Sequence, residues 1–115
     1  MPSDDRSSVV DIITAIEQIA EFVGNMSKEE FLDDYKTQAA VLHELMIIGE
    51  AAKRLSEGFR RDHKSVPWKM IAGMRDKLIH EYDAADIEEV WNTLKQDLPA
   101  LQDYLKRLVS RKEDI

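Results

Sequence analysis

The first apolar stretch of the chain recurs with the period of an α-helix, and this pattern constrains the fold more than any other feature. Between residues 8 and 23, polar and acidic residues separate apolar side chains at helical spacing: Val9, Val10, Ile12, Ile13, Ile16, Ile19, Ala20 and Val23. Gly24 and Asn25 follow and predict the end of this helix. The 115 residues include only 4 glycines and 3 prolines, too few turn residues for a many-stranded β protein. The chain is therefore predicted to be all-α.

Local signals divide the rest of the chain into four further predicted helices. Ser27 and Glu30 have the spacing of a capping box and predict a short helix over residues 28–33. A long helix is expected over residues 34–57, ended by Gly58, and a basic loop or frayed turn over 58–66 follows it. The next expected helix runs from Pro67 to Ile79 or Tyr82. The last runs from the cap Asp86 to Leu108, and Pro99 is expected to kink or break it near Asp97. Short connections predict an antiparallel bundle of four main helices and one short one, in a single domain over residues 1–115.

Charge is distributed unevenly along the chain. The net charge is −7, which argues against broad binding to a phosphate backbone. Residues 51–82 nevertheless carry 8 basic and 4 acidic side chains, and they also contain His63 and His80. This basic segment can attract an anion locally, although a chance cluster on a solvated face explains the charge pattern equally well.

Several classes of protein are excluded or disfavoured by residue usage. Cysteine is absent, which excludes disulfide bonds, thiolate zinc sites and cysteine nucleophiles. The three histidines lack metal-ligand spacing, so no metal site and no cofactor is predicted. No apolar run approaches the ~20 residues of a membrane helix, and no secretory signal precedes the first helix. A cytoplasmic protein without membrane contact is expected.

The fourth predicted helix contains an arginine where an apolar residue is expected. Its apolar face comprises Trp68, Ile71, Ala72, Leu78, Ile79 and Tyr82, and Arg75 falls in the middle of that face. An unpaired charge in an apolar setting is costly, so Arg75 requires a carboxylate, a subunit boundary or an anionic ligand. An intramolecular ion pair or a side chain that reaches solvent would also satisfy it.

His80 follows Arg75 by five residues and is the side chain best suited to proton transfer near neutral pH. Five residues of ideal helix rotate by about 140° net, so the two side chains would not share a face. They can converge if the helix ends before His80, or if two copies of the helix meet across a dimer axis. Gly73 lies on the His80 side of the helix and leaves space there.

This region resembles a known family. The run GMRDKLIHEYDAADIEEVW, from Gly73 to Trp91, is similar to the signature of HepT-like toxins, which belong to the HEPN superfamily of helical ribonucleases. The matching pattern is Arg75, four residues, His80, one residue and Tyr82. The segments IIGEAAKRLSEGFR and VPWKMIAGMRDKL also resemble this branch, and the similarity extends from about residue 6 to 108. Glu81 stands where the family commonly has a small residue. Its negative charge beside His80 is expected to raise the pKa of His80 or to weaken the approach of RNA.

The resemblance implies an HEPN-like homodimer that acts as a metal-independent endoribonuclease, with the two motifs facing a shared cleft. RNA supplies its own nucleophile, the 2′-hydroxyl next to each phosphate, so that the protein needs a proton-transfer group and a cation. His80 suits the first role and Arg75 the second, and the expected products carry a 2′,3′-cyclic phosphate and a 5′-hydroxyl. Asp76 is expected to orient one of them, or simply to face solvent.

The resemblance also implies a protein partner and a modified residue. In the HepT branch, the tyrosine at the position of Tyr82 receives AMP from a cognate nucleotidyltransferase antitoxin, here expected to be MntA-like. Added AMP would bring bulk and negative charge into the RNA cleft. Without the resemblance, Tyr82 would be read as a packing residue at the end of its helix.

Three basic residues are further candidates for contacts with RNA phosphates, namely Arg54, Lys69 and Lys77. Solvated surface is the alternative for each, and Arg54 can instead pair with Glu50, four residues earlier. Two other functions stay open at this point. The chain can be a non-catalytic helical partner that binds a nucleotide or substrate for a nucleotidyltransferase, or Arg75 can be an ion-pair residue of a dimer interface.

Overall fold

The computed structural model describes residues 2–80 and 86–113, with side chains except at positions 75–80 and 111–113. The elements in chain order are α1 (Ser3–Val23), α2 (Lys28–Leu32), α3 (Tyr35–Arg54), α4 (Glu57–Asp62), α5 (Trp68–His80), α6 (Ile87–Asn92), the π-helical turn η2 (Thr93–Asp97) and α7 (Leu98–Glu113). The predicted all-α class is confirmed.

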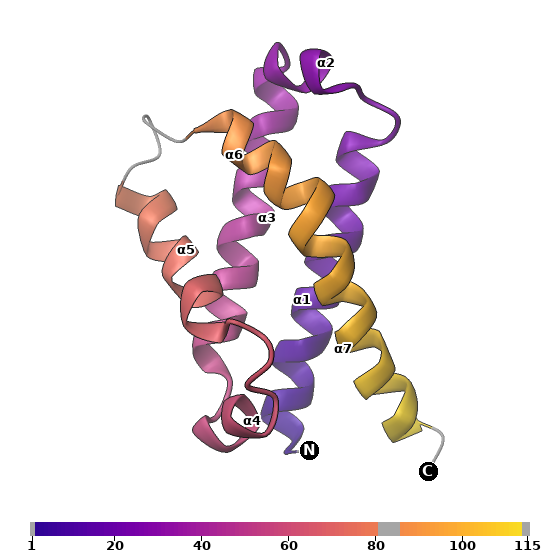
Figure 1. The fold of residues 1–115 in the computed structure, drawn as a ribbon, viewed down its shortest axis with the longest axis vertical. Coiled ribbons are helices and arrows are strands. Elements are labelled where there is room, and N and C mark those ends of the chain that lie inside the picture. The colour runs from indigo at the N-terminus through magenta and orange to yellow at the C-terminus, as the bar shows by residue number, and fades with distance from the viewer. Residues whose placement is uncertain (1, 81–85, 114–115) are drawn as a thin grey trace.

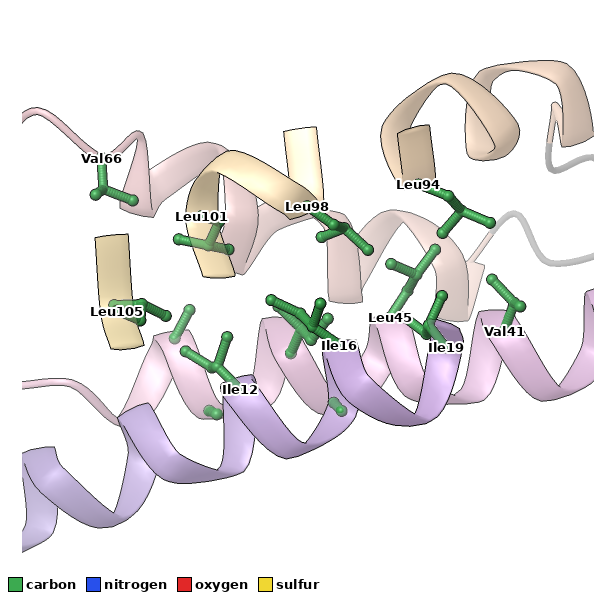
Figure 2. Close-up of a cluster of buried hydrophobic side chains, with 14 of the residues drawn as sticks. Ile12, Ile16, Ile19, Val41, Leu45, Val66, Leu94, Leu98, Leu101 and Leu105 are labelled. Carbon is green, nitrogen blue, oxygen red and sulfur yellow. The ribbon is translucent and has the colours of Figure 1, made fainter. Parts of the chain in front are cut away.

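The helices form two layers around one core. α1 and α3 lie side by side, while α5 packs against α3 and α7 packs against α1 (Figure 1). Figure 2 shows the side chains that fill the space between these layers, with Ile12, Ile16 and Ile19 on α1 opposite Leu98, Leu101 and Leu105 on α7. All six are buried, as the apolar spacing in the sequence predicts. α5 thus lies at an outer edge of the molecule, supported by α3.

Most helix ends lie where local capping chemistry places them. Gly24 ends α1 with a φ of 53°, a left-handed conformation that glycine adopts without strain. The capping box at α2 is confirmed, since the Glu30 N–H donates to Ser27 Oγ at 3.1 Å and the Ser27 N–H donates to Glu30 Oε1 at 2.9 Å. Asp86 caps α6 by accepting the Glu89 N–H at 3.2 Å, also as predicted.

Asp34 caps the long helix α3. Its carboxylate accepts the Thr37 backbone N–H at 3.0 Å and the Thr37 hydroxyl at 2.8 Å. The hydrogen bond from the Thr37 backbone N–H, and to a smaller extent the one from its hydroxyl, hold the pKa of Asp34 below its usual value of 3.8. Asp34 therefore stays charged at the positive end of the helix dipole under ordinary conditions.

Pro99 produces a wide turn and not a break. The helical run continues from Ile87 to Glu113, and the turn Thr93–Asp97 that precedes Pro99 is π-helical. The Leu98 N–H donates to the carbonyl of Thr93, five residues back. Proline has no N–H and its ring crowds the carbonyl four residues earlier, so a wider turn accommodates it without ending the helix. The irregularity predicted near Asp97 is therefore confirmed in its position, and it is a π-helical turn over Thr93–Asp97.

The prediction for residues 57–66 is wrong in one respect. The long helix ends at Arg54, before Gly58, and residues Glu57–Asp62 form the separate helix α4 where a basic loop was expected. Ser56 caps α4 by accepting the Phe59 N–H on its Oγ at 3.1 Å. Asp5, which is 2% exposed, holds Ser56 in place through bonds to its backbone N–H at 2.8 Å and its hydroxyl at 2.7 Å. Because this contact spans 51 residues of sequence, no local pattern reveals it.

Candidate active site

α5 is anchored firmly at its beginning. Trp68 is 4% exposed, and its indole N–H donates to the carbonyl of His63 at 3.0 Å. Its ring lies 5.8 Å from that of Phe59 on α4. Pro67 precedes it, and the Ile71 N–H donates to the Pro67 carbonyl at 3.1 Å to close the first turn. The start of the helix that carries the Arg75–His80 motif is therefore fixed by α4 and the core.

The motif lies entirely on α5. This helix runs without interruption through Arg75, Asp76 and Lys77 and ends at His80. The proposal that the helix ends before His80 is therefore wrong. Within one chain, the backbone positions of Arg75 and His80 differ by about 140° around the axis and by about 7.5 Å along it. Glu81 and Tyr82 lie outside the described residues.

The described part of the outer face of α5 carries Lys69, Met70 and Gly73, all exposed. Met70 is 68% exposed, which is unusual for a large apolar side chain. A Cβ built on Gly73 would meet no atom of the described residues within 4 Å. Lys69, predicted to contact RNA phosphates, is thus placed on the surface of the motif helix.

Arg54 lies at the other end of the basic segment and has an intramolecular partner. Its guanidinium Nη2 lies 3.0 Å from Oδ2 of Asp11 on α1, with both side chains about half exposed. Sequence spacing favoured Glu50 as the partner, four residues earlier on the same helix. Arg54 is consequently less suited to bind phosphate than Lys69, because a phosphate would have to compete with the Asp11 carboxylate.

Two other members of the basic segment have structural roles that the sequence did not reveal. The Arg60 guanidinium donates from Nη2 to the carbonyl of Leu55 at 2.9 Å and to that of Lys53 at 3.3 Å, where α3 ends. His63 shares a hydrogen bond of 2.8 Å between its Nδ1 and the Tyr104 hydroxyl, and its ring stacks 4.5 Å from Phe59. These contacts tie α4 to α3 and α7.

The described residues offer no assembled metal site. Across residues 2–80 and 86–113, no three His, Asp or Glu side chains with described positions gather closely enough to hold a metal ion. In the same part of the chain, no helix is long and apolar enough to cross a membrane.

The fold and the motif define this protein as an all-α domain with an Arg-x4-His pair on one helix. Comparison with known proteins identifies the family. Residues 12–108 match the family "Ribonuclease HepT-like". The chain is 44% identical to the "Probable ribonuclease HepT" of Thermococcus cleftensis over 108 residues, which cover 94% of this chain and 98% of the relative. It is 38% identical to "Putative RNase MJ0127" of Methanocaldococcus jannaschii, over 99% of this chain and 98% of that protein.

A third relative is of similar length. "Putative RNase TTE0752" of Caldanaerobacter subterraneus subsp. tengcongensis is 40% identical over 102 residues, which cover 89% of this chain and 91% of the relative. No solved structure matched the chain. The chain belongs to the HepT-like ribonuclease family of the HEPN superfamily, as the resemblance in the sequence indicated.

Proposed function

We propose that this protein is an endoribonuclease in which Arg75 and His80 are the catalytic residues. The observation that carries the proposal is the placement of both residues on one helix, α5, whose beginning is anchored in the core and whose outer face carries the exposed Lys69. Family membership over residues 12–108 supports the same reaction. RNA is the substrate class because its 2′-hydroxyl supplies a nucleophile next to each phosphate.

The reaction is an internal transesterification. The 2′-hydroxyl oxygen attacks the adjacent phosphorus while the bond from phosphorus to the 5′-oxygen breaks. A proton leaves the 2′-oxygen and a proton reaches the departing 5′-oxygen, and His80 serves this proton transfer. Arg75 stabilises the negative charge that builds on the non-bridging oxygens, for which its planar set of N–H donors is well suited. The products end in a 2′,3′-cyclic phosphate and a 5′-hydroxyl, and no step requires a metal ion.

The working unit is proposed to be a homodimer. The backbone positions of Arg75 and His80 on an uninterrupted α5 differ by about 140° around the helix axis, which supports a site shared between two chains. A two-fold axis beside α5 would place Arg75 of one protomer opposite His80 of the other. Asp76 is proposed to orient one of these side chains across that interface. Lys69, with Lys77 on the same helix, would guide the RNA strand toward the cleft, and Arg54 would contribute at its margin.

The test is a cleavage assay with analysis of product ends. Purified protein incubated with single-stranded RNA in excess EDTA is expected to give fragments with 2′,3′-cyclic phosphate and 5′-hydroxyl ends. The same sequence as DNA should stay intact, because it has no 2′-hydroxyl. Fragments with 5′-phosphate ends, or a requirement for added Mg²⁺, would contradict the mechanism. Intact RNA together with tight nucleotide binding would favour a non-catalytic partner of a nucleotidyltransferase.

We also propose that the activity is controlled by a nucleotidyltransferase antitoxin that modifies Tyr82. In this step the Tyr82 oxygen bonds to the α-phosphorus of ATP and pyrophosphate leaves, so that AMP remains on the tyrosine. Tyr82 follows His80 by two residues, so the added phosphate and adenosine would occupy the RNA cleft and repel the substrate. This control would make the pair a toxin and its antitoxin.

Intact mass after co-expression measures this modification directly. The wild-type chain is expected to gain the mass of one or more AMP groups and to lose RNA cleavage. Tyr82→Phe has no oxygen to modify and is expected to keep its unmodified mass. An AMP adduct that persists on Tyr82→Phe would place the modification elsewhere. An adduct on Tyr82 that leaves cleavage unchanged would contradict its inhibitory role.

A further inference from the structure

Gly73 occupies an exposed position in the middle of α5, and no contact among the described residues explains why a glycine stands there. Glycine is the poorest helix former after proline, because it has the most conformational freedom to lose. Among the described residues only Gly24 has a glycine φ in the positive range, so Gly73 is not required by its backbone conformation. A Cβ at Gly73 would face open space as far as the described residues extend, so packing does not require it either.

The surroundings of Gly73 indicate what approaches it. We define the Gly73 face as Lys69, Met70 and Gly73, which all lie exposed on α5. Lys69 precedes Gly73 by one helical turn, while Lys77 follows it by one turn and His80 by two. A cation therefore flanks the gap, and the proton-transfer residue shares this side of the helix. The exposed Met70 adds a soft apolar contact suited to a sugar or a base.

We propose that the Gly73 face is where the sugar–phosphate backbone of RNA lies directly against α5, which makes Gly73 a positioning residue for the strand. The missing side chain would let the backbone come closer to the helix than any other residue permits. Charge favours this occupant over a second copy of the chain. A symmetric contact between two copies of this face would bring together the lysines at positions 69 and 77 of both chains, whereas a polyanion neutralises them. The inference rests on the proposed ribonuclease function and adds a contact outside the Arg75–His80 pair.

A series of larger side chains at position 73 tests the proposal. Gly73→Ala and Gly73→Leu are expected to melt at or above the wild-type temperature, because both residues favour helices and the space is open. Binding is measured by fluorescence polarisation with labelled, fully 2′-O-methylated single-stranded RNA, which cannot be cleaved. Gly73→Leu is expected to weaken the affinity about tenfold, and Gly73→Ala by a smaller factor. The KM for cleavable RNA is expected to rise in the same order.

The chain offers a matched control in Gly58. This glycine also lies in a helix, α4, and its Cβ would meet only ordinary contacts at 3.9 and 4.0 Å. Gly58→Ala is expected to bind the 2′-O-methylated RNA like the wild type. Equal RNA affinity of Gly73→Leu and wild type would overturn the proposal. So would a change in oligomeric mass by light scattering, which would make the face a protein contact, or a large fall in melting temperature in both Gly73 variants.

The outcomes also separate this inference from the proposed function. If the wild type cleaves RNA and the Gly73 variants bind and cleave equally well, only the role of the Gly73 face is lost. If the wild type binds the 2′-O-methylated RNA but does not cleave RNA, the ribonuclease function fails, while the affinity series still decides whether the strand lies on this face. A wild type that neither binds nor cleaves RNA overturns both.

Discussion

The His80→Ala variant is expected to lose RNA cleavage by at least about 100-fold while keeping its fold. A positioned general acid or base contributes about 10² to 10⁴ in rate, and alanine can neither accept nor donate a proton. His80 is the last residue of α5, so its replacement leaves the anchored first turn at Trp68 intact. Initial rates on a defined RNA, together with thermal unfolding followed by circular dichroism, measure both parts of this result.

His63 provides the matched control, since it is the other histidine of the basic segment. Its Nδ1 bonds to the Tyr104 hydroxyl and its ring stacks on Phe59, so its contacts are structural. His63→Ala is expected to lower the melting temperature and to retain cleavage at temperatures where the variant is folded. His80→Ala should therefore lose activity and keep its stability, whereas His63→Ala should lose stability and keep its activity. Cleavage by His80→Ala at the wild-type rate would assign the chemistry to another residue.

A second large effect is expected when two inactive variants are combined. Arg75→Gln and His80→Ala are each expected to be inactive as homodimers. If each site takes Arg75 from one protomer and His80 from the other, a mixed dimer contains one site with both wild-type residues. The purified mixed dimer has one active site of two and is expected to show about half of the wild-type rate. Co-expression with two different affinity tags yields the mixed dimer for assay.

This recovery depends on the geometry of α5. Activity that stays absent in the purified mixed dimer would show that each site uses both residues of one chain, which the uninterrupted helix disfavours. A monomeric mass for the active wild-type protein would also contradict the composite site. The single variants serve as internal controls, because each must be inactive alone for the recovery to be interpretable.

Local signals in the sequence predicted the elements that local chemistry decides. Ser27, Asp86 and Gly24 act on residues within one turn, so the helix ends at α2, α6 and α1 were correctly placed. The cap of α4 is a local signal that was missed, since Ser56 accepts the N–H of Phe59 three residues on. The Asp5 carboxylate that holds Ser56 lies 51 residues away, and Asp11, the partner of Arg54, lies 43 residues away. Spacing along the chain does not identify partners that only the fold brings together.

The candidate site was predictable to a similar extent. The apolar periodicity predicted the helix that carries Arg75 and His80, and the structure places both on α5. It did not decide whether that helix ends before His80, because no local stop signal lies between Arg75 and His80. The proposed meeting of the two residues across a dimer involves contacts that the sequence of one chain does not reveal. The exposed position of Gly73 became informative only when the surrounding atoms showed that nothing described fills its space.

The bond between Asp5 and Ser56 has a consequence for the amino terminus. Asp5 lies in the first turn of α1, yet it holds the cap of α4, and α4 in turn supports Trp68 at the start of α5. Trimming of the first five residues by a protease would leave most of the apolar interior intact but remove the acceptor for Ser56. Loss of Asp5 would thus weaken the support of α5, the helix that carries Arg75 and His80, without touching that helix.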